Sequence, residues 1–162
     1  MKVNSWLMMG FKLEQEARKF LKEAYNLELE VPVLINGRLK STYGRFVHNR
    51  VQKRPVKIEI SKNYIEHQEF ETVRETLLHE CIHYALYMKG LPYKDGHPVF
   101  EAELKKWGSH STGTVKYHGK VVQYACPSCG YTYNKKKRYP RNRAYHSGCC
   151  NKPIKFIGEK IV

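Results

Sequence analysis

Acidic residues are scarce in the last third of this 162-residue sequence. Residues 111–162 contain 11 lysines and arginines but only one acidic residue, Glu159, whereas residues 1–110 contain 18 basic and 14 acidic residues. The C-terminal third therefore carries +10 of the net charge of +14. Positive charge at this density favours a polyanionic partner such as nucleic acid, with a membrane surface as the second choice.

Long apolar runs are absent as well, because no stretch approaches the roughly 18 uninterrupted apolar residues of a membrane-spanning helix. The apolar patch from Trp6 to Phe11 ends at Lys12 and Glu14, and no small-residue cleavage site follows it. This pattern argues against a secretory signal. We therefore expect a soluble, cytoplasmic protein that does not associate with a membrane.

The composition is that of a globular protein, with 41% apolar and 27% charged residues. The length allows one domain and a small appendage but excludes two full-sized enzymatic domains. A polar, glycine-bearing stretch predicts a linker at residues 111–120. We expect a core at residues 1–110 and a small basic module at residues 121–162.

The core has the pattern of an α+β fold. Apolar residues at helical spacing predict an amphipathic helix from Lys12 to Asn26. Segments rich in β-branched and aromatic residues predict a small, mainly antiparallel sheet, and they span residues 31–35, 43–48 and 56–60. A long helix is predicted at residues 68–89, and a shorter one follows and ends near Trp107.

The long helix carries the pattern HExxH at residues 79–83. Residues four apart lie on one face of a helix, so His79 and His83 can bind one zinc ion while Glu80 reaches a water molecule beside it. Zinc lowers the pKa of such a water to about 7, and a carboxylate can take its proton during attack on a peptide carbonyl. The alternative is a pair of ordinary buried histidines, but unpaired histidine and glutamate would be costly on an apolar helix.

A third zinc ligand is available after this helix. His97 follows His83 by 14 residues, where the loop after Gly90 can return the chain to the metal. Glu101, one turn further on, is the rival ligand, as in zinc sites built from two histidines and a glutamate. We favour His97.

With these motifs the sequence resembles the SprT-like family of zinc metallopeptidases. Besides HExxH, residues 95–100 (DGHPVF) resemble the family's second signature, and residues 35–39 (INGRL) and 44–46 (GRF) match its pattern of strand ends and turns. The resemblance covers about residues 13–158. It implies a zincin-like protease core with Glu80 as the general base and a zinc ion bound by His79, His83 and His97.

Four of the five cysteines lie in the C-terminal third, where their spacing favours metal binding over disulfides. Cys126 and Cys129 have the spacing of a zinc knuckle. The family's ribbon has a second pair of this kind, which His146 and Cys149 match here, and Cys150 is the alternative ligand. A module this small buries little core, which favours a structural zinc ion in a zinc ribbon.

The segment between these ligand pairs is basic and aromatic. Lysine and arginine neutralise phosphates and tyrosine offers a face to an unstacked base, so we expect binding to single-stranded or distorted DNA. The alternative is a solvated hairpin whose tyrosines pack the thin core of the ribbon. The candidate contacts are Lys135, Lys136, Lys137, Arg138, Arg141, Arg143, Tyr131 and Tyr133.

The sequence therefore predicts a monomeric zinc endopeptidase with one catalytic and one structural zinc ion. The resemblance implies protein substrates that are associated with DNA or crosslinked to it. A DNA-binding adaptor that keeps the fold without proteolysis is a second hypothesis, and a metallopeptidase for a dedicated protein partner is a third. The intact HExxH motif argues against the adaptor.

Overall fold

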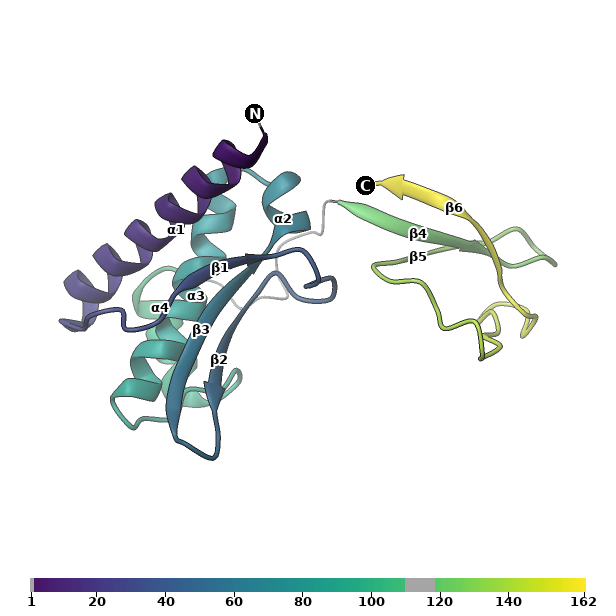
Figure 1. The fold of residues 1–162 in the computed structure, drawn as a ribbon. Coiled ribbons are helices and arrows are strands. Elements are labelled where there is room, and N and C mark those ends of the chain that lie inside the picture. The colour runs from purple at the N-terminus through teal and green to yellow at the C-terminus, as the bar shows by residue number, and fades with distance from the viewer. Residues whose placement is uncertain (1, 110–118) are drawn as a thin grey trace. The chain divides into compact units, whose positions relative to one another are not determined.

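The computed structural model describes residues 2–109 and 119–162, and these residues form two compact units (Figure 1). The first unit lies N-terminal to residues 110–118 and the second unit lies C-terminal to them. Most of the linker predicted at residues 111–120 falls outside the described residues. We describe each unit by itself.

The described residues form a mixed α+β structure with four helices and two three-stranded sheets, which confirms the predicted α+β class. The helices are α1 (Lys2–Tyr25), α2 (Lys62–Glu66), α3 (Phe70–Met88) and α4 (Pro98–Lys106). The strands of the first unit are β1 (Val33–Asn36), β2 (Gly44–Asn49) and β3 (Arg54–Ser61). Those of the second unit are β4 (Lys120–Ala125), β5 (Thr132–Lys135) and β6 (Lys155–Ile161).

The sheet of the first unit has the strand order β1-β3-β2, with β2 at an edge. Strand β3 pairs antiparallel with β2 but parallel with β1, so this sheet is mixed and not mainly antiparallel as predicted. The parallel pairing aligns Val33 with Ile58 and Ile35 with Ile60. It thereby gathers apolar side chains on one face, which stabilises the non-local pairing.

The core of the first unit lies between that face and helices α1 and α3 (Figure 1). Leu13, Ala17 and Leu21 of α1 and Leu77 of α3 are fully buried, as the apolar periodicity predicts. Cys81 is buried in the same core. Buried apolar residues recur along α3 and pack in the core. This packing fixes the positions of the polar residues that the same helix carries.

Residues 35–46 brace the sheet around one buried carboxylate. Glu59 of β3 accepts hydrogen bonds from Asn36 Nδ2 at 3.1 Å and Arg45 Nε at 2.5 Å, and it forms an ion pair with Lys57 at 2.7 Å. Asn36 Oδ1 also accepts from the backbone N–H of Arg38 at 2.8 Å. Asn36, Arg38 and Arg45 therefore stabilise the scaffold, whereas Gly44 and Phe46 of the same segment lie next to Glu80.

Gly44 of β2 lies where α3 approaches the sheet most closely. A Cβ atom at this position would stand 3.1 Å from Glu80 Cγ, from Ile60 Cδ1 and from Thr76 Cγ2. Contacts this short require the neighbouring atoms to move. Glycine at this position thus leaves room for the Glu80 side chain.

We expect Gly44→Ala to lower the free energy of unfolding by about 1–3 kcal/mol, because the added methyl group overpacks this contact. Chemical denaturation measures the change. Gly10→Ala on α1 is the matched control, since no atom beyond the adjacent backbone of its own helix lies within 4 Å of the position that its methyl group would take. That control should stabilise the protein by up to about 1 kcal/mol through helix propensity. If Gly44→Ala has the same free energy of unfolding as the wild type, the contact between Gly44 and α3 is not tight.

The second unit is a small antiparallel sheet of order β5-β4-β6. The rings of Tyr139 and Tyr145 stack at 3.8 Å, and the Tyr139 N–H donates to the Tyr124 hydroxyl at 2.9 Å.

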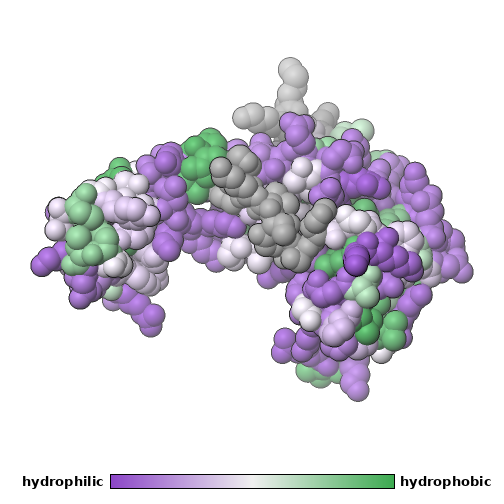
Figure 2. Space-filling model, turned by 180° about the vertical axis from the view of Figure 1, so that it is seen from behind, coloured by the Kyte–Doolittle hydropathy of each residue, from purple (hydrophilic) through white to green (hydrophobic). Residues whose placement is uncertain are grey.

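The surface of the described residues that is seen in Figure 2 is mainly hydrophilic, with small apolar patches. In the described parts of the chain, no helix has the length and apolarity needed to cross a membrane.

Candidate functional site

The HExxH segment lies in the middle of α3, and its two histidines point their Nε2 atoms at each other. His79 and His83 are 1% and 8% exposed, and their Nε2 atoms are 3.1 Å apart. Phe100 of α4 stacks on the His83 ring at 4.0 Å and meets the His79 ring edge-on at 5.1 Å. The helix and this aromatic ring therefore hold both imidazoles in one orientation.

Asp95, in the loop between α3 and α4, supplies a third donor atom. Its Oδ1 lies 3.0 Å from His79 Nε2 and 3.4 Å from His83 Nε2. A tetrahedral zinc ion with bonds of about 2.0 Å keeps its ligand atoms about 3.3 Å apart. The three donor atoms therefore have the spacing of three ligands around one zinc ion, and a fourth position would remain for water.

The chemistry of the donor atoms also fits a cation. His83 Nδ1 donates a hydrogen bond to the Tyr93 carbonyl oxygen, which leaves the Nε2 lone pair directed at the cluster. Contact with the imidazoles of His79 and His83 holds the pKa of Asp95 far below its usual range, so this carboxylate carries the negative charge that a cation requires. Two imidazoles and a carboxylate converging on one point form a donor set suited to zinc.

Glu80 lies beside this cluster without belonging to it. The residue is 4% exposed, and its carboxylate accepts a hydrogen bond from the backbone N–H of Phe46 on β2. Burial raises the pKa of Glu80, although His83 and His79 oppose the shift. A buried carboxylate with a raised pKa, held next to a metal site, is suited to accept and return a proton.

The structure does not bring His97 to the histidine pair. His97 is the N-cap residue of α4, where its Nδ1 accepts a hydrogen bond from the Val99 N–H at 3.2 Å. Glu101, the rival ligand, instead accepts from the Gly96 N–H at 2.9 Å. Both residues shape the loop that presents Asp95, which the sequence had indicated only as the first residue of the DGHPVF segment. A carboxylate in the loop that follows HExxH is the signal that could have identified it.

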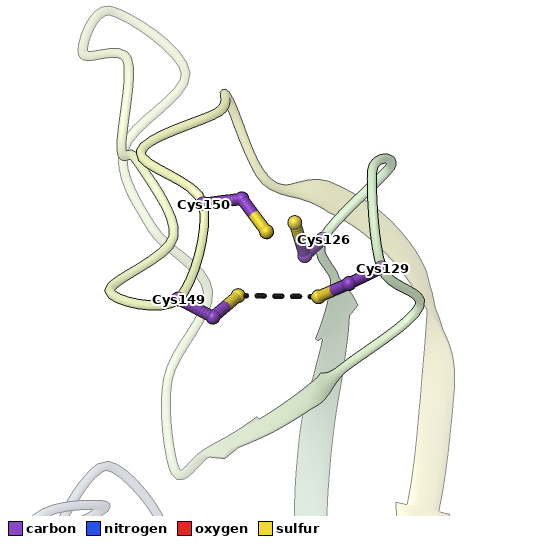
Figure 3. A group of neighbouring side chains, drawn as sticks. All are labelled: Cys126, Cys129, Cys149 and Cys150. Atoms are coloured by element: carbon purple, nitrogen blue, oxygen red, sulfur yellow. Dashed lines mark hydrogen bonds between the residues drawn. The ribbon is translucent and has the colours of Figure 1, made fainter.

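The second unit holds a separate cluster of four cysteines, Cys126, Cys129, Cys149 and Cys150. Figure 3 shows their side chains pointing toward one another from two loops. Their sulfur atoms all lie within 4.8 Å of one another, and Cys129 Sγ is 3.4 Å from Cys149 Sγ. Zinc–sulfur bonds of about 2.3 Å give sulfur–sulfur spacings of about 3.8 Å, so the cluster fits a structural zinc ion.

The structure places Cys150, and not His146, at the fourth position of this cluster. His146 is exposed and pairs with Pro153 in an isolated β-bridge. The tight turn that follows is closed by hydrogen bonds from the Ser147 N–H to the Lys152 carbonyl and from the Asn151 N–H to the Ser147 carbonyl. This turn directs the sulfur atoms of two consecutive cysteines to the same point, which sequence spacing alone did not indicate.

Neighbouring hydroxyl groups favour the thiolate form of Cys126 and Cys149, whereas contacts with neighbouring cysteines raise the pKa of Cys129 and Cys150. A hydrogen bond with Ser147 lowers the pKa of Cys126 to about 6, and the hydrogen bond that Tyr133 donates at 3.1 Å lowers the pKa of Cys149. Thiolate is the form of cysteine that binds a metal. Tyr133 therefore contacts the cysteine cluster, whereas Tyr131, expected to share its role, is 61% exposed.

The basic residues of the ribbon differ in how accessible their side chains are to a ligand. Arg138 lies over the Phe156 ring at 4.2 Å and 3.7 Å from Glu159, so it packs against the sheet. Lys136 is half-buried, and burial lowers its pKa. Arg138 is nevertheless exposed. The exposed basic residues of the predicted set that form no ion pair within the described residues are Lys135, Lys137, Arg141 and Arg143.

These features define a mixed α+β protein with two candidate metal centres, one of histidine and aspartate and one of cysteine. A model of the SprT-like family matches residues 12–122, and the chain belongs to this family. Protein SprT-like of Bacillus velezensis is 35% identical over 130 residues, which cover 75% of this chain and 80% of that protein.

Two further relatives carry the same name. Protein SprT-like of Geobacillus kaustophilus is 30% identical over 129 residues, covering 75% of this chain and 80% of that protein. Its counterpart in Streptococcus thermophilus is 26% identical over 144 residues, covering 85% of this chain and 91% of that protein. No solved structure matches the chain.

Proposed function

We propose that this protein is a zinc-dependent endopeptidase that acts on proteins associated with DNA or crosslinked to it. The proposal assigns residues 1–110 to a zincin-like protease core and residues 121–162 to a zinc ribbon that binds nucleic acid. It places the protein in the cytoplasm as a monomer. The observation that carries it is the buried carboxylate of Glu80 beside the converging donor atoms of His79, His83 and Asp95.

The residues of the core have separate roles in the proposed reaction. A zinc ion held by His79, His83 and Asp95 would supply a Lewis acid for a water molecule and a peptide carbonyl. Glu80 takes a proton from the attacking water at its carboxylate and passes it to the nitrogen of the leaving amine. The Phe46 N–H keeps one Glu80 oxygen oriented during both transfers. Phe100 keeps the imidazoles in place.

The basic ribbon supports the nucleic-acid part of the proposal. Residues 111–162 carry a net charge of +10, and Lys135, Lys137, Arg141 and Arg143 are exposed. Within the described residues, none of these four forms an ion pair with a carboxylate, whereas Glu159 is already paired with Lys120 and Arg138. Exposed cations can exchange their counterions for phosphates without breaking the fold. Because phosphates carry no sequence information, binding should not depend on base sequence.

Charge reversal to glutamate at Lys135, Lys137, Arg141 and Arg143 should weaken DNA binding on all sequences alike. Wild-type log affinity should fall against log salt with a slope of about −3 to −5 for four to six phosphate contacts, and the variant's slope should be shallower. Fluorescence anisotropy over a salt series measures both slopes. Cleavage of a DNA-bound protein should fall with binding, but cleavage of a free unstructured protein should not.

The matched control reverses four exposed cations of the first unit, Lys19, Lys40, Arg50 and Lys105. This variant has the same net charge and should keep the wild-type slope. Equal loss in both variants would show that total charge, and not the ribbon, binds DNA. If wild-type protein loaded with zinc cleaves neither the DNA-bound nor the free protein, the endopeptidase proposal is wrong.

A further inference from the structure

Edge strand β2 contacts two different parts of the candidate metal centre. The Phe46 N–H donates to Glu80, and two residues further along His48 Nε2 lies 3.0 Å from the Tyr93 hydroxyl oxygen, within hydrogen-bond distance. The side chains of Phe46 and His48 both contact Tyr87 of α3, at 5.4 and 4.8 Å between ring centroids, because alternate residues of a strand share a face. One strand thus reaches both the proposed base and the loop after α3.

Tyr93 connects this strand to the metal ligands. Its backbone carbonyl accepts the hydrogen bond from His83 Nδ1, and its hydroxyl bonds with His48. Asp95 follows two residues later in the same loop. The position of Tyr93 therefore affects both the orientation of His83 and the start of the turn that carries the Asp95 carboxylate.

Asp95 needs such an anchor because its own side chain is 65% exposed. Packing does not hold an exposed carboxylate, so the location of Oδ1 follows from the backbone of its loop. The Gly96 N–H, which donates to Glu101, fixes the far side of this loop, and Tyr93 fixes the near side. A loop that is already fixed loses less conformational entropy when it binds an ion.

We infer that His48 is a positioning residue of the metal centre: it holds the Tyr93 hydroxyl and thereby fixes the loop that provides Asp95 and orients His83. The inference rests on the metal centre of the proposed function and adds a residue outside the HExxH segment and its loop. His48 does not touch the reacting atoms. It acts through Tyr93, so its first effect is on metal affinity.

A simple packing role is the competing explanation, because the His48 ring also contacts Tyr87 and Phe46. The two roles depend on different atoms. Within the described residues His48 Nδ1 is buried and has no hydrogen-bond partner, so Nε2 makes the polar contact. Replacing that one nitrogen, with the bulk of the side chain kept, separates positioning from packing.

Competition with a zinc chelator measures zinc affinity in four full-length variants. A His83→Ala protein identifies the part of the signal that comes from the cysteine centre. His48→Leu and Tyr93→Phe should weaken zinc binding at the histidine centre about 10–100-fold, as losses of outer-shell partners do. His48→Gln should stay within about threefold of wild type, because its amide nitrogen replaces Nε2. Tyr87→Phe, which removes a hydroxyl from the same aromatic cluster, should bind zinc as the wild type does.

Wild-type zinc affinity in both His48→Leu and Tyr93→Phe would overturn the inference, and so would an equal loss in Tyr87→Phe. If His48→Leu does not fold, Tyr93→Phe decides the question because it removes one oxygen atom only. The d–d spectrum of the cobalt-substituted protein should shift in Tyr93→Phe but should stay close to the wild-type spectrum in His48→Gln. Absence of proteolysis by the wild type would refute the proposed function but would leave this comparison of affinities intact.

Discussion

Glu80→Gln is expected to abolish proteolysis while the fold and both metal centres stay intact. The amide matches the carboxylate in size and can still accept the hydrogen bond from the Phe46 N–H. It cannot take a proton from water at neutral pH. Loss of a general base costs about 10²–10⁴-fold in rate, which brings cleavage to the detection limit. Cleavage of an unstructured protein, measured beside metal content, records both effects.

Glu75→Gln is the matched control, because Glu75 is an exposed glutamate on the same helix. It should cleave as the wild type does. Near-normal proteolysis by Glu80→Gln would show that another group takes the proton. Loss of zinc from Glu80→Gln would instead show that Glu80 coordinates the metal and does not act as the general base.

The second large effect separates Asp95 from His97 as the third ligand. Asp95→Ala should weaken zinc binding at the histidine centre by more than about 100-fold, because a direct ligand matters more than an outer-shell partner. His97→Ala should keep the zinc ion and cost about 1 kcal/mol of stability through loss of the α4 cap. Chelator competition and thermal unfolding measure the two quantities.

His97→Asn tests the capping role directly, since asparagine is a favoured N-cap residue. This variant should recover the stability lost in His97→Ala and bind zinc as the wild type does. The opposite result, with zinc lost in His97→Ala and kept in Asp95→Ala, would restore His97 as the ligand that the sequence favoured. Asp95 would then be an exposed loop residue.

The parts of the protein that depend on local periodicity could be predicted from the sequence. Leu13, Ala17 and Leu21 lie at helical spacing and are buried as that spacing indicates. His79 and His83 lie four residues apart in α3, so helix geometry alone brings their rings together. The parallel pairing of β1 with β3 is non-local, and the pattern of apolar residues could not distinguish it from an antiparallel pairing.

The third donor of the histidine centre and the fourth donor of the cysteine centre were harder to predict because loops determine them. Asp95 and His97 are two residues apart, and only the hydrogen bonds of the turn decide which side chain faces the histidine pair. The choice between His146 and Cys150 depends in the same way on the turn around Ser147. The different roles of Tyr131 and Tyr133 likewise follow from one hydrogen bond to Cys149.

The central claim is that one chain holds a histidine–aspartate centre and a cysteine centre. The zinc content of the folded, dialysed protein tests this claim most directly. The two donor sets lie on separate units, and each set has the spacing of zinc ligands. We predict two zinc ions per chain in the wild type and one in His83→Ala. A wild-type value of one or none would contradict the claim.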